Sequence, residues 1–352
     1  MTTRTRPLSL FSAGLLTILL CAASLNVAAA DWTIVDLGMP STYPDERTRA
    51  AGINNRGEIV GTYTNADDLF RAFLFVDGNF HDLGTLGGDE AGATGINGRG
   101  QVVGWSRTAT GSYRGFIYTN GVMQALPTLG GDSGGANAIN EKGEVVGGSA
   151  TAGGQSHAFL YSNGVMTDLG TLGGDFSVAT GTNTRGEVVG YGTVAGGTPW
   201  TYHAFIWSNG TMQDLGSLGG TVTLANGINE RGQVVGVSSV PNGSPAHAFL
   251  WARGTMQDLS PAIYSYRTSN AKAINNAGEA VGYNTVEDGG SYHPILLRGG
   301  TWIFLESLPE VTDAGWYLSL GDPVPPVISD AGQIVGVGAH NLQWRFFLLK
   351  PL

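Results

Sequence analysis

One short phrase recurs seven times along the 352-residue chain, and it limits the folds that the chain can adopt. The phrase is Ile-Asn-x-x-Gly, followed by an apolar run and a second glycine. It reads INNRGEIVG from position 53, INGRGQVVG from 96, INEKGEVVG from 139, TNTRGEVVG from 182, INERGQVVG from 228, INNAGEAVG from 274 and ISDAGQIVG from 328. The intervals between the Asn or Ser positions are 43, 43, 43, 46, 46 and 54 residues. Such a period is typical of propellers, solenoids and similar arrays.

Each repeat can be divided into four short antiparallel strands. In the third copy they are expected at 137–139, 144–148, 157–161 and 165–170. The turn at 140–143 begins with an asparagine, whose side chain can cap it, and ends with a glycine, which takes a positive φ at little cost. No later part of the chain has the periodicity of a helix. The sequence therefore predicts an all-β fold.

The two ends of the chain distinguish a closed ring from an open stack. The last copy contains RFFLL at 345–349, but the chain ends before a fourth strand. The segment WTIVDLG at 32–38 matches the fourth strands TMQDLG at 211–216 and VMTDLG at 165–170. A strand donated from the N-terminus would complete the last blade and remove an exposed edge, whereas a solenoid needs capping units. We therefore expect a seven-bladed β-propeller of four-stranded antiparallel blades.

Residues 1–30 have the pattern of a secretory signal peptide. Arg4 and Arg6 precede an apolar run over 8–20, and alanines at 28 and 30 give the small-x-small cleavage pattern. The run has roughly 13 residues, whereas a membrane-spanning helix needs about 20. Cleavage is therefore favoured over anchoring. We expect an exported protein, secreted or periplasmic, with no transmembrane span and with one mature domain over 31–352.

Cys21, the only cysteine, lies within this signal. Leu20 precedes it where a lipoprotein signal needs a small residue, so no lipid anchor is expected. A mature chain without cysteine has no disulfide and no thiolate metal site. Loss of Arg4 and Arg6 leaves 16 of the 18 basic residues against 28 acidic ones, which disfavours nucleic acid and anionic membranes as partners. We expect a monomer without metal or cofactor.

These motifs resemble those of the extracellular HAF-repeat family, named for a His-Ala-Phe tripeptide. The tripeptide stands at 157–159, 203–205 and 247–249, and Gly-Thr-Leu-Gly-Gly or Gly-Ser-Leu-Gly-Gly phrases begin at 84, 170 and 216. The resemblance covers nearly all of 32–349, and the seventh copy departs most, with Ser329 for Asn and RFF for HAF. It implies secretion and a β-propeller-like repeat, and it implies no activity.

One basic residue recurs at the start of the third strand. The series consists of His157, His203, His247 and His293, with Arg71, Arg114 and Arg345 in the other copies. Equivalent positions on different blades lie too far apart for the roughly 2 Å bonds of one metal ion. We therefore expect these residues to be scaffold, which either pair with aspartates on the neighbouring strand or bond carbonyl groups of the loops. The candidates for that pairing are Asp82, Asp168, Asp214 and Asp258.

Two other repeated features suggest chemistry, but a structural interpretation is favoured for both. Leu-Gly-Gly-Asp phrases begin at 86, 129 and 172, but no Gly-Lys-Ser or Gly-Lys-Thr follows, so they are interpreted as connections between blades and not as phosphate loops. The aspartates Asp82, Asp168 and Asp214 could be acids for glycosidic chemistry. Their repetition on one strand argues instead for a structural role.

The residues that vary between copies are the better candidates for function. Small residues before each Ile-Asn place that strand innermost, followed outward by the Val-Val-Gly, His-Ala-Phe and Asp-Leu-Gly strands. The uniform turns then share one face, and the variable loops share the other, which is where a site is expected. The aromatic and basic residues proposed to bind a ligand there are Tyr113, Trp200, Tyr202, Tyr264, Tyr266, Arg267, Tyr292, Trp316, Tyr317 and Trp344. The alternative is that these rings fill gaps between blades.

Three functions remain open from the sequence. The first is a non-catalytic scaffold that binds a glycan or an extracellular protein through the variable-loop face. The second is a propeller enzyme, a hydrolase or lyase, that acts on polysaccharide. Its candidate groups are Tyr264, Tyr266, Arg267, His293, Glu310, Asp313 and His340. The third is a purely structural extracellular protein.

Overall fold

The computed structural model describes residues 32–40, 47–198, 200–241, 245–260, 268–285, 291–318 and 324–352. Within these ranges the fold is all-β, as the sequence predicts. The helices among the described residues are a 3-10 turn, η2 (Leu305–Ser307), and a five-residue helix, α1 (Pro309–Asp313). The expectation of a chain without helices is wrong for this short insert. Pro309 occupies the first turn of α1, where proline is tolerated because that N–H has no intrahelical partner.

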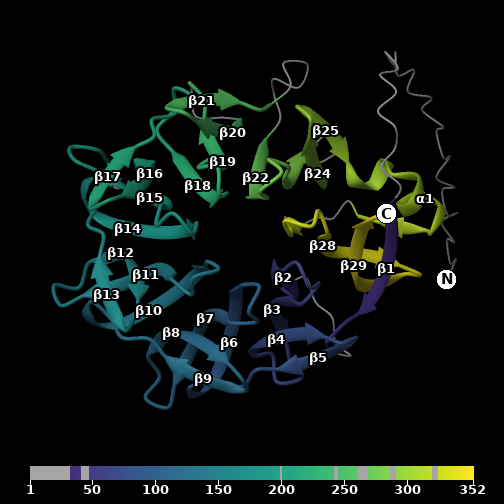
Figure 1. Ribbon diagram of the computed structural model, residues 1–352, viewed down its shortest axis with the longest axis horizontal. Helices are drawn as coiled ribbons and strands as arrows, with labels where there is room; N and C mark the ends of the chain where they lie inside the picture. The colour runs from purple at the N-terminus through teal and green to yellow at the C-terminus, as the bar shows by residue number, and fades with distance from the viewer. Residues whose placement is uncertain are drawn as a thin grey trace, which may run out of the picture. The chain divides into compact units, whose positions relative to one another are not determined.

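Most strands form four-stranded antiparallel sheets in chain order (Figure 1). The first contains β2 (Arg49–Ile53), β3 (Ile59–Thr64), β4 (Phe70–Val76) and β5 (Asn79–Asp82). The second contains β6 (Gly87–Ile96), β7 (Val102–Thr108), β8 (Tyr113–Thr119) and β9 (Val122–Ala125). Further along are the sheet of β18 (Thr223–Ile228), β19 (Val234–Ser239), β20 (Ala246–Ala252) and β21 (Thr255–Asp258), and that of β22 (Ser269–Ile274), β23 (Ala280–Thr285), β24 (Tyr292–Arg298) and β25 (Thr301–Phe304).

Between them lie two more groups of four strands. One contains β10 (Gly130–Ile139), β11 (Val145–Thr151), β12 (Ser156–Ser162) and β13 (Val165–Asp168), and the other β14 (Gly173–Thr182), β15 (Val188–Val194), β16 (Tyr202–Ser208) and β17 (Thr211–Asp214). Each group is antiparallel, and a single parallel pair, Ser156 with Phe176, connects the two. The Gly-Gly-Asp residues expected to form connections are instead the first residues of β6, β10 and β14.

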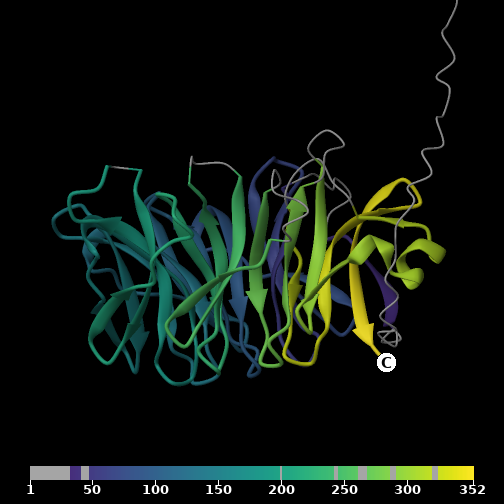
Figure 2. The same ribbon diagram turned by 90° about the horizontal axis from the view of Figure 1, so that it is seen from above.

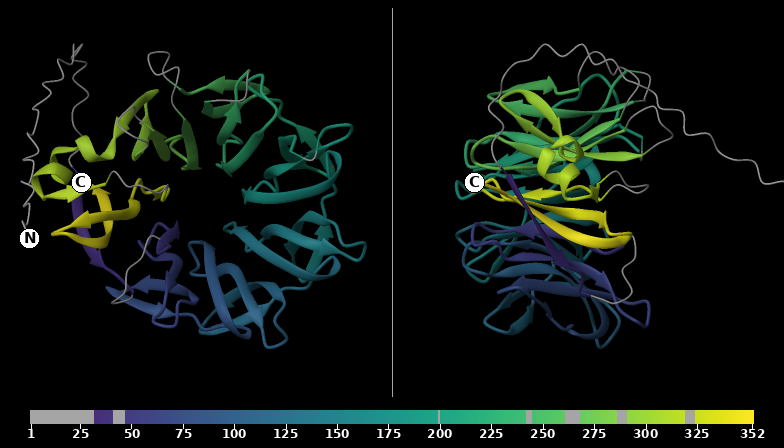
Figure 3. Two further views of the ribbon diagram at one scale, coloured as in Figure 1. Left: turned by 180° about the vertical axis from the view of Figure 1, so that it is seen from behind. Right: turned by 90° about the vertical axis from the view of Figure 1, so that its right-hand side faces the viewer.

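The last sheet combines the two ends of the described chain. It contains β1 (Trp32–Gly38), β29 (Gln343–Pro351), β28 (Ile334–His340), β26 (Trp316–Tyr317) and β27 (Val327–Ile328). β1 pairs antiparallel with β29 from Trp32 opposite Pro351 to Gly38 opposite Phe346. The predicted pairing of segment 32–38 with segment 345–349 is therefore present. Figure 3 shows β1 beside β29, although the two strands lie at opposite ends of the described chain.

The hydrophobic core lies between adjacent sheets. One cluster joins Val146 and Ala158 of one sheet to Ala179, Val188 and Phe205 of the next. The repeated Val-Val-Gly and Ala-Phe segments supply these side chains because alternate residues of a strand point to opposite faces. The glycine is needed for close approach, since a Cβ on Gly147 would lie 2.0 Å from the carbonyl oxygen of Gly135.

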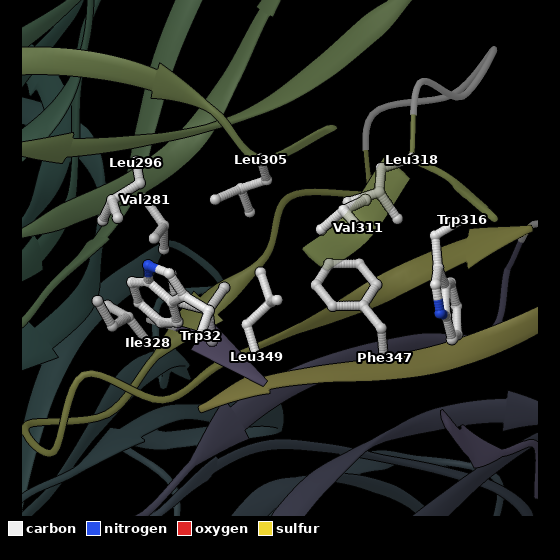
Figure 4. Packing of buried hydrophobic residues seen from close by; sticks show 11 residues of the cluster. Trp32, Val281, Leu296, Leu305, Val311, Trp316, Leu318, Ile328, Phe347 and Leu349 are labelled. Carbon is white, nitrogen blue, oxygen red and sulfur yellow. The ribbon is translucent and has the colours of Figure 1, made fainter. Parts of the chain in front are cut away.

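The same packing extends across the sheet that holds both ends. Val281 and Leu296 pack with Trp32, Phe347 and Leu349 (Figure 4). On the other side, Ala50 and Ile53 of β2 share a cluster with Val335 and Phe346. The sheets thus follow one another around a common centre, and strands run between two faces that carry the connections (Figures 1 and 2).

Candidate binding surface

The asparagine of each Ile-Asn-x-x-Gly phrase joins its own turn to the next sheet. Asn140 Oδ1 accepts the N–H groups of Lys142 and Glu144, both at 3.0 Å, and so caps the turn as expected. Its Nδ2 also donates to the carbonyl oxygen of Asn183 at 2.9 Å. The same donation runs from Asn54 to Asn97, Asn97 to Asn140, Asn183 to Asn229, Asn229 to Asn275 and Asn275 to Ser329, at 3.0, 3.0, 3.1, 3.0 and 3.3 Å.

These hydrogen bonds give the asparagines of the turn face a structural role. The six asparagines are buried, with at most 5% of each exposed. Ser329 has no side-chain amide, so it cannot make the same bond to the first sheet. The link from this last turn to the first one is instead a hydrogen bond from the N–H of Ala331 to Asn55 Oδ1, at 3.0 Å. A buried amide that bonds two units cannot also contact a ligand. A binding site is therefore expected at the opposite face.

Three histidines of the third strand pair with aspartates of the fourth strand, so the predicted pairing is present. The Nδ1 to Oδ2 distance is 2.9 Å for His157 with Asp168 and 2.6 Å for His203 with Asp214. The same contact joins His247 to Asp258 at 2.7 Å, and Arg71 Nε to Asp82 at 3.0 Å. The second oxygen of Asp168 accepts the N–H of Gly170 at 2.8 Å, which fixes the turn that leaves the blade.

The other copies vary this contact. His293 pairs with Glu306 of η2, and Asp36 of β1 accepts from His340 at 3.0 Å. In the second copy Ala125 lies opposite Phe116, at the position that Asp82, Asp168, Asp214 and Asp258 occupy in their sheets, so Arg114 has no acidic partner of this kind. Among the described residues, no group of three or more His, Cys, Asp or Glu side chains could hold a metal ion.

The environment of Asp82 shifts two pKa values. Burial, strengthened by the 2.9 Å hydrogen bond to Asp82, raises the pKa of Tyr63 to about 12. Burial by itself would raise the pKa of Asp82, but hydrogen bonds from Arg71, the Gly84 N–H and Tyr63 outweigh it and lower that pKa. The pairing is therefore built to hold a carboxylate and a neutral phenol side by side.

A pH dependence follows from the Tyr63 shift. An unfolded tyrosine ionises near pH 10, whereas the folded protein keeps Tyr63 protonated to about pH 12, so stability that is present below pH 10 is lost as the pH rises toward 12. In Tyr63→Phe this alkaline loss should be smaller, with a cost of roughly 1 kcal/mol near neutral pH from the missing hydrogen bond. Urea unfolding at several pH values measures both. An equally steep loss in Tyr63→Phe and in the exposed control Tyr317→Phe would contradict the assignment.

The predicted aromatic residues fall into two groups. Tyr113, Trp200 and Tyr317 are exposed, at 42, 76 and 60%. Tyr202 and Tyr292 are half-buried and pack edge-to-face on Tyr191 and Tyr283, with ring centroids 6.0 and 5.0 Å apart. Trp344 is half-buried against the cluster that contains Phe346. The gap-filling alternative therefore describes these half-buried rings, whereas the exposed rings remain available for contact.

Trp316 is not an exposed ring, and its expected role at the surface is wrong. Only 7% of it is exposed, and it stacks on His340 with centroids 4.6 Å apart. It belongs to the cluster of Trp32 and Phe347, because β26 pairs with the end of β28 (Figure 4). Tyr264, Tyr266 and Arg267 lie outside the described residues.

The described candidates for a polysaccharide enzyme mostly contact the scaffold. Glu310 Oε1 accepts the N–H of Trp32 at 3.3 Å and so ties α1 to β1. His293 and His340 each pair with a carboxylate, as above, and Asp313 is exposed at the end of α1. Glu310 and His340 both lie at the last sheet, where each has a structural partner, Trp32 and Asp36 respectively.

The sequence indicated only part of the arrangement of these residues. The aromatic positions were visible as departures from the repeat, but their burial was not. Tyr63 of β3 and Trp105 of β7 were not among the candidates. Trp105 packs on Phe70 of the preceding sheet and on Tyr113, with centroids 6.3 and 5.6 Å apart. Arg107 lies over the Tyr113 ring and pairs with Asp89 at 3.1 Å.

The fold and these contacts define a propeller-like, all-β repeat protein. No protein-family model and no curated protein matches the chain. Among solved structures, it is similar to the β-propeller domain of the Trilobed protease from Pyrococcus furiosus, with a TM-score of 0.55 and 10% identity, over 86% of this chain and 95% of that one. That similarity supports the fold class.

Two peptidase structures are similar over a comparable part of the chain. One is a puromycin-hydrolyzing peptidase of Mycobacterium tuberculosis, with a TM-score of 0.51, 13% identity and coverage of 87% of this chain and 52% of that one. The other is a puromycin hydrolase mutant complexed with PGG, at 0.52 and 12%, over 85% and 53%. The chain thus matches about half the length of each peptidase. In the described residues no helix is long and apolar enough to cross a membrane.

Proposed function

We propose that this chain is an exported, seven-bladed β-propeller closed by β1, which binds an extracellular glycan or protein through its variable-loop face. The seven copies of the repeat, the four-stranded sheets and the pairing of β1 with β29 support the blade count and the closure. A resemblance to HAF repeats and the signal-like N-terminus support export. The similar propeller structures support the architecture and carry no activity to this chain.

The difference between the two faces is the observation that carries the binding role. One face is occupied by buried asparagines that link successive sheets. The other carries Tyr113, Trp200 and Tyr317, which are the exposed aromatic rings among the described residues. Each lies near the start of a third strand or, for Tyr317, beside the end of β28. Rigid rings give apolar contact area at low entropic cost, which suits sugar faces and protein side chains.

The polysaccharide-enzyme alternative has less support. Glu310, His293 and His340 each have a scaffold partner, so their substitution is expected to change stability before it changes any reaction. The purely structural role makes a different prediction, which is that no variant of the loop face changes binding.

The test uses Tyr113→Ala and Trp200→Ala. A ligand is first identified with a glycan array and a pull-down using the exported chain. Each substitution should weaken binding about 2- to 12-fold, as expected for about 0.5 to 1.5 kcal/mol per ring contact, and the double variant should weaken it further. The melting temperature should stay at the wild-type value in Trp200→Ala and should fall only slightly in Tyr113→Ala, which also loses the contacts of Tyr113 with Trp105 and Arg107.

Val122→Ala and Val165→Ala are the matched controls. These valines are also exposed, at 55 and 63%, but each is the first residue of a fourth strand, next to the hairpin turn at the opposite face. They should bind normally. If Tyr113→Ala and Trp200→Ala bound normally and the valine variants lost binding, the site would lie on the turn face, and the proposed face would be wrong. Early unfolding of the aromatic variants would make those rings packing elements.

A further inference from the structure

A second line of side-chain donors connects the innermost strands. Each donor stands three residues before a repeated asparagine and bonds the carbonyl of an alanine in the next innermost strand. Asn137 Nδ2 donates to Ala179 at 2.7 Å, and Asn226 Nδ2 to Ala271 at 2.8 Å. Thr94 and Thr180 donate in the same way to Ala136 and Ala225, at 2.9 and 2.8 Å. All four donors are neutral, which suits groups held between packed sheets.

Lys272 breaks this series. It stands three residues before Asn275, in the place of Asn137 and Asn226, but among the described residues its ammonium has no hydrogen bond or ion pair. The next innermost strand, β27, has only two residues, and Pro325 and Pro326 precede it. Proline has no N–H and does not extend the ladder. Lys272 therefore faces a shortened strand, and no residue that the structure describes neutralises its charge.

The surroundings of Lys272 are confined although its side chain is exposed to solvent. Burial by the protein around it lowers the pKa of Lys272, and the positive charge of Arg49 lowers it further. Arg49 is therefore near enough to act on the ammonium electrostatically.

The register explains why these two cations converge. Asn226 Nδ2 also donates to Asn270 Oδ1 at 2.7 Å. Asn226 stands three residues before Asn229, and Asn270 stands five residues before the next repeated asparagine, Asn275, so side chains at these two positions meet between adjacent sheets. Arg49 stands five residues before Asn54 and Lys272 three residues before Asn275, so the same register is expected to direct both side chains toward the last sheet. β22 and β2, which carry them, both pack against β27. Arg49 is exposed and, within the described chain, has no ion-pair partner.

We propose that Lys272 and Arg49 together bind a small oxyanion, a phosphate or a carboxylate group, at the inner edge of the sheets beside β27. Two unpaired cations held near each other repel, and an oxyanion between them neutralises both. The guanidinium offers a planar pair of donors and the ammonium a movable point charge, which together suit either group. The formal net charge of the chain is −10, so the attraction is local to this pair and is not a property of the whole surface. The site is independent of the loop face.

The experiment measures anion binding to the full exported chain. Melting temperature and isothermal titration are recorded with sodium phosphate, sodium acetate and sodium chloride at equal ionic strength. Phosphate or acetate should raise the melting temperature above the chloride value and should give saturable heat. A response to phosphate only assigns a phosphoryl-type ligand, and a response to acetate only assigns a carboxylate. Equal melting temperatures in all three salts would overturn the proposal.

Two variants and one control connect the response to this pair. Lys272→Asn installs the residue that Asn137 and Asn226 supply elsewhere, so the fold should be kept, and binding should fall roughly tenfold or more. Arg49→Gln should have a comparable effect. Lys142→Asn also removes one exposed positive charge, but at a turn, and should bind as the wild type does. Unchanged anion affinity in Lys272→Asn, with a wild-type circular dichroism spectrum, would refute the assignment.

Discussion

A chain that begins at Pro40 instead of Asp31 should aggregate or melt far below the chain that begins at Asp31. The missing segment contains β1, whose ladder with β29 runs from Trp32 to Gly38. Without it, β29 would have an unpaired edge, and Leu349 and Phe347 would lose the cover of Trp32. Unpaired edges with apolar neighbours are templates for aggregation. Thermal unfolding followed by circular dichroism, with sedimentation to detect aggregates, measures the effect.

A point variant keeps this prediction testable if the truncated chain is not recovered. Trp32 is 5% exposed, and its ring lies under the Arg298 guanidinium at 4.8 Å. Its backbone N–H donates to Glu310, a bond that alanine can also make. Trp32→Ala should cost about 3 to 5 kcal/mol in unfolding free energy, as for other buried aromatic truncations. Val35→Ala, at an exposed position of the same strand, is the control and should change little. A wild-type melting curve for the truncated chain would disprove the role of β1 in closure.

Asn140→Ala should be the most damaging single substitution in the repeat turns. It removes an acceptor for two N–H groups and leaves the carbonyl of Asn183 without its donor, all in a buried place. Buried polar groups left unpaired cost about 1 to 3 kcal/mol each, so a loss of roughly 3 to 5 kcal/mol is expected. Urea unfolding of both proteins gives the difference.

Asn140→Ser separates the two roles of this side chain. Ser329 shows that serine can cap the turn, since its Oγ accepts the N–H of Gln333 at 3.2 Å. Serine at 140 should therefore keep the turn and lose the bond to the next sheet, with about half of the alanine effect. If the serine and alanine variants were equally unstable, the link between sheets would explain the whole loss. If serine were harmless, that link would contribute nothing measurable.

The sequence already contained the local part of this structure. The turn at Asn140 was predictable because its hydrogen bonds join residues two and four apart, and the His157–Asp168 pairing because antiparallel strands linked by a tight turn place those residues on adjacent strands. The strand at 32–38 was identifiable as a match to the fourth strands of other copies. Repetition made each of these signals visible several times.

Tertiary structure decided the features that depend on residues distant in sequence. The second bond of Asn140 reaches Asn183, and Glu310 reaches Trp32 across 278 positions. Trp316 and Tyr317 are adjacent aromatics, yet only Tyr317 is exposed, because a strand turns alternate side chains to opposite faces and the core lies on one of them. β22 and β2, which carry Lys272 and Arg49, both pack against β27 although they lie at opposite ends of the repeat array. Sequence periodicity determined what each sheet is, and packing between sheets determined which side chains remained free to bind.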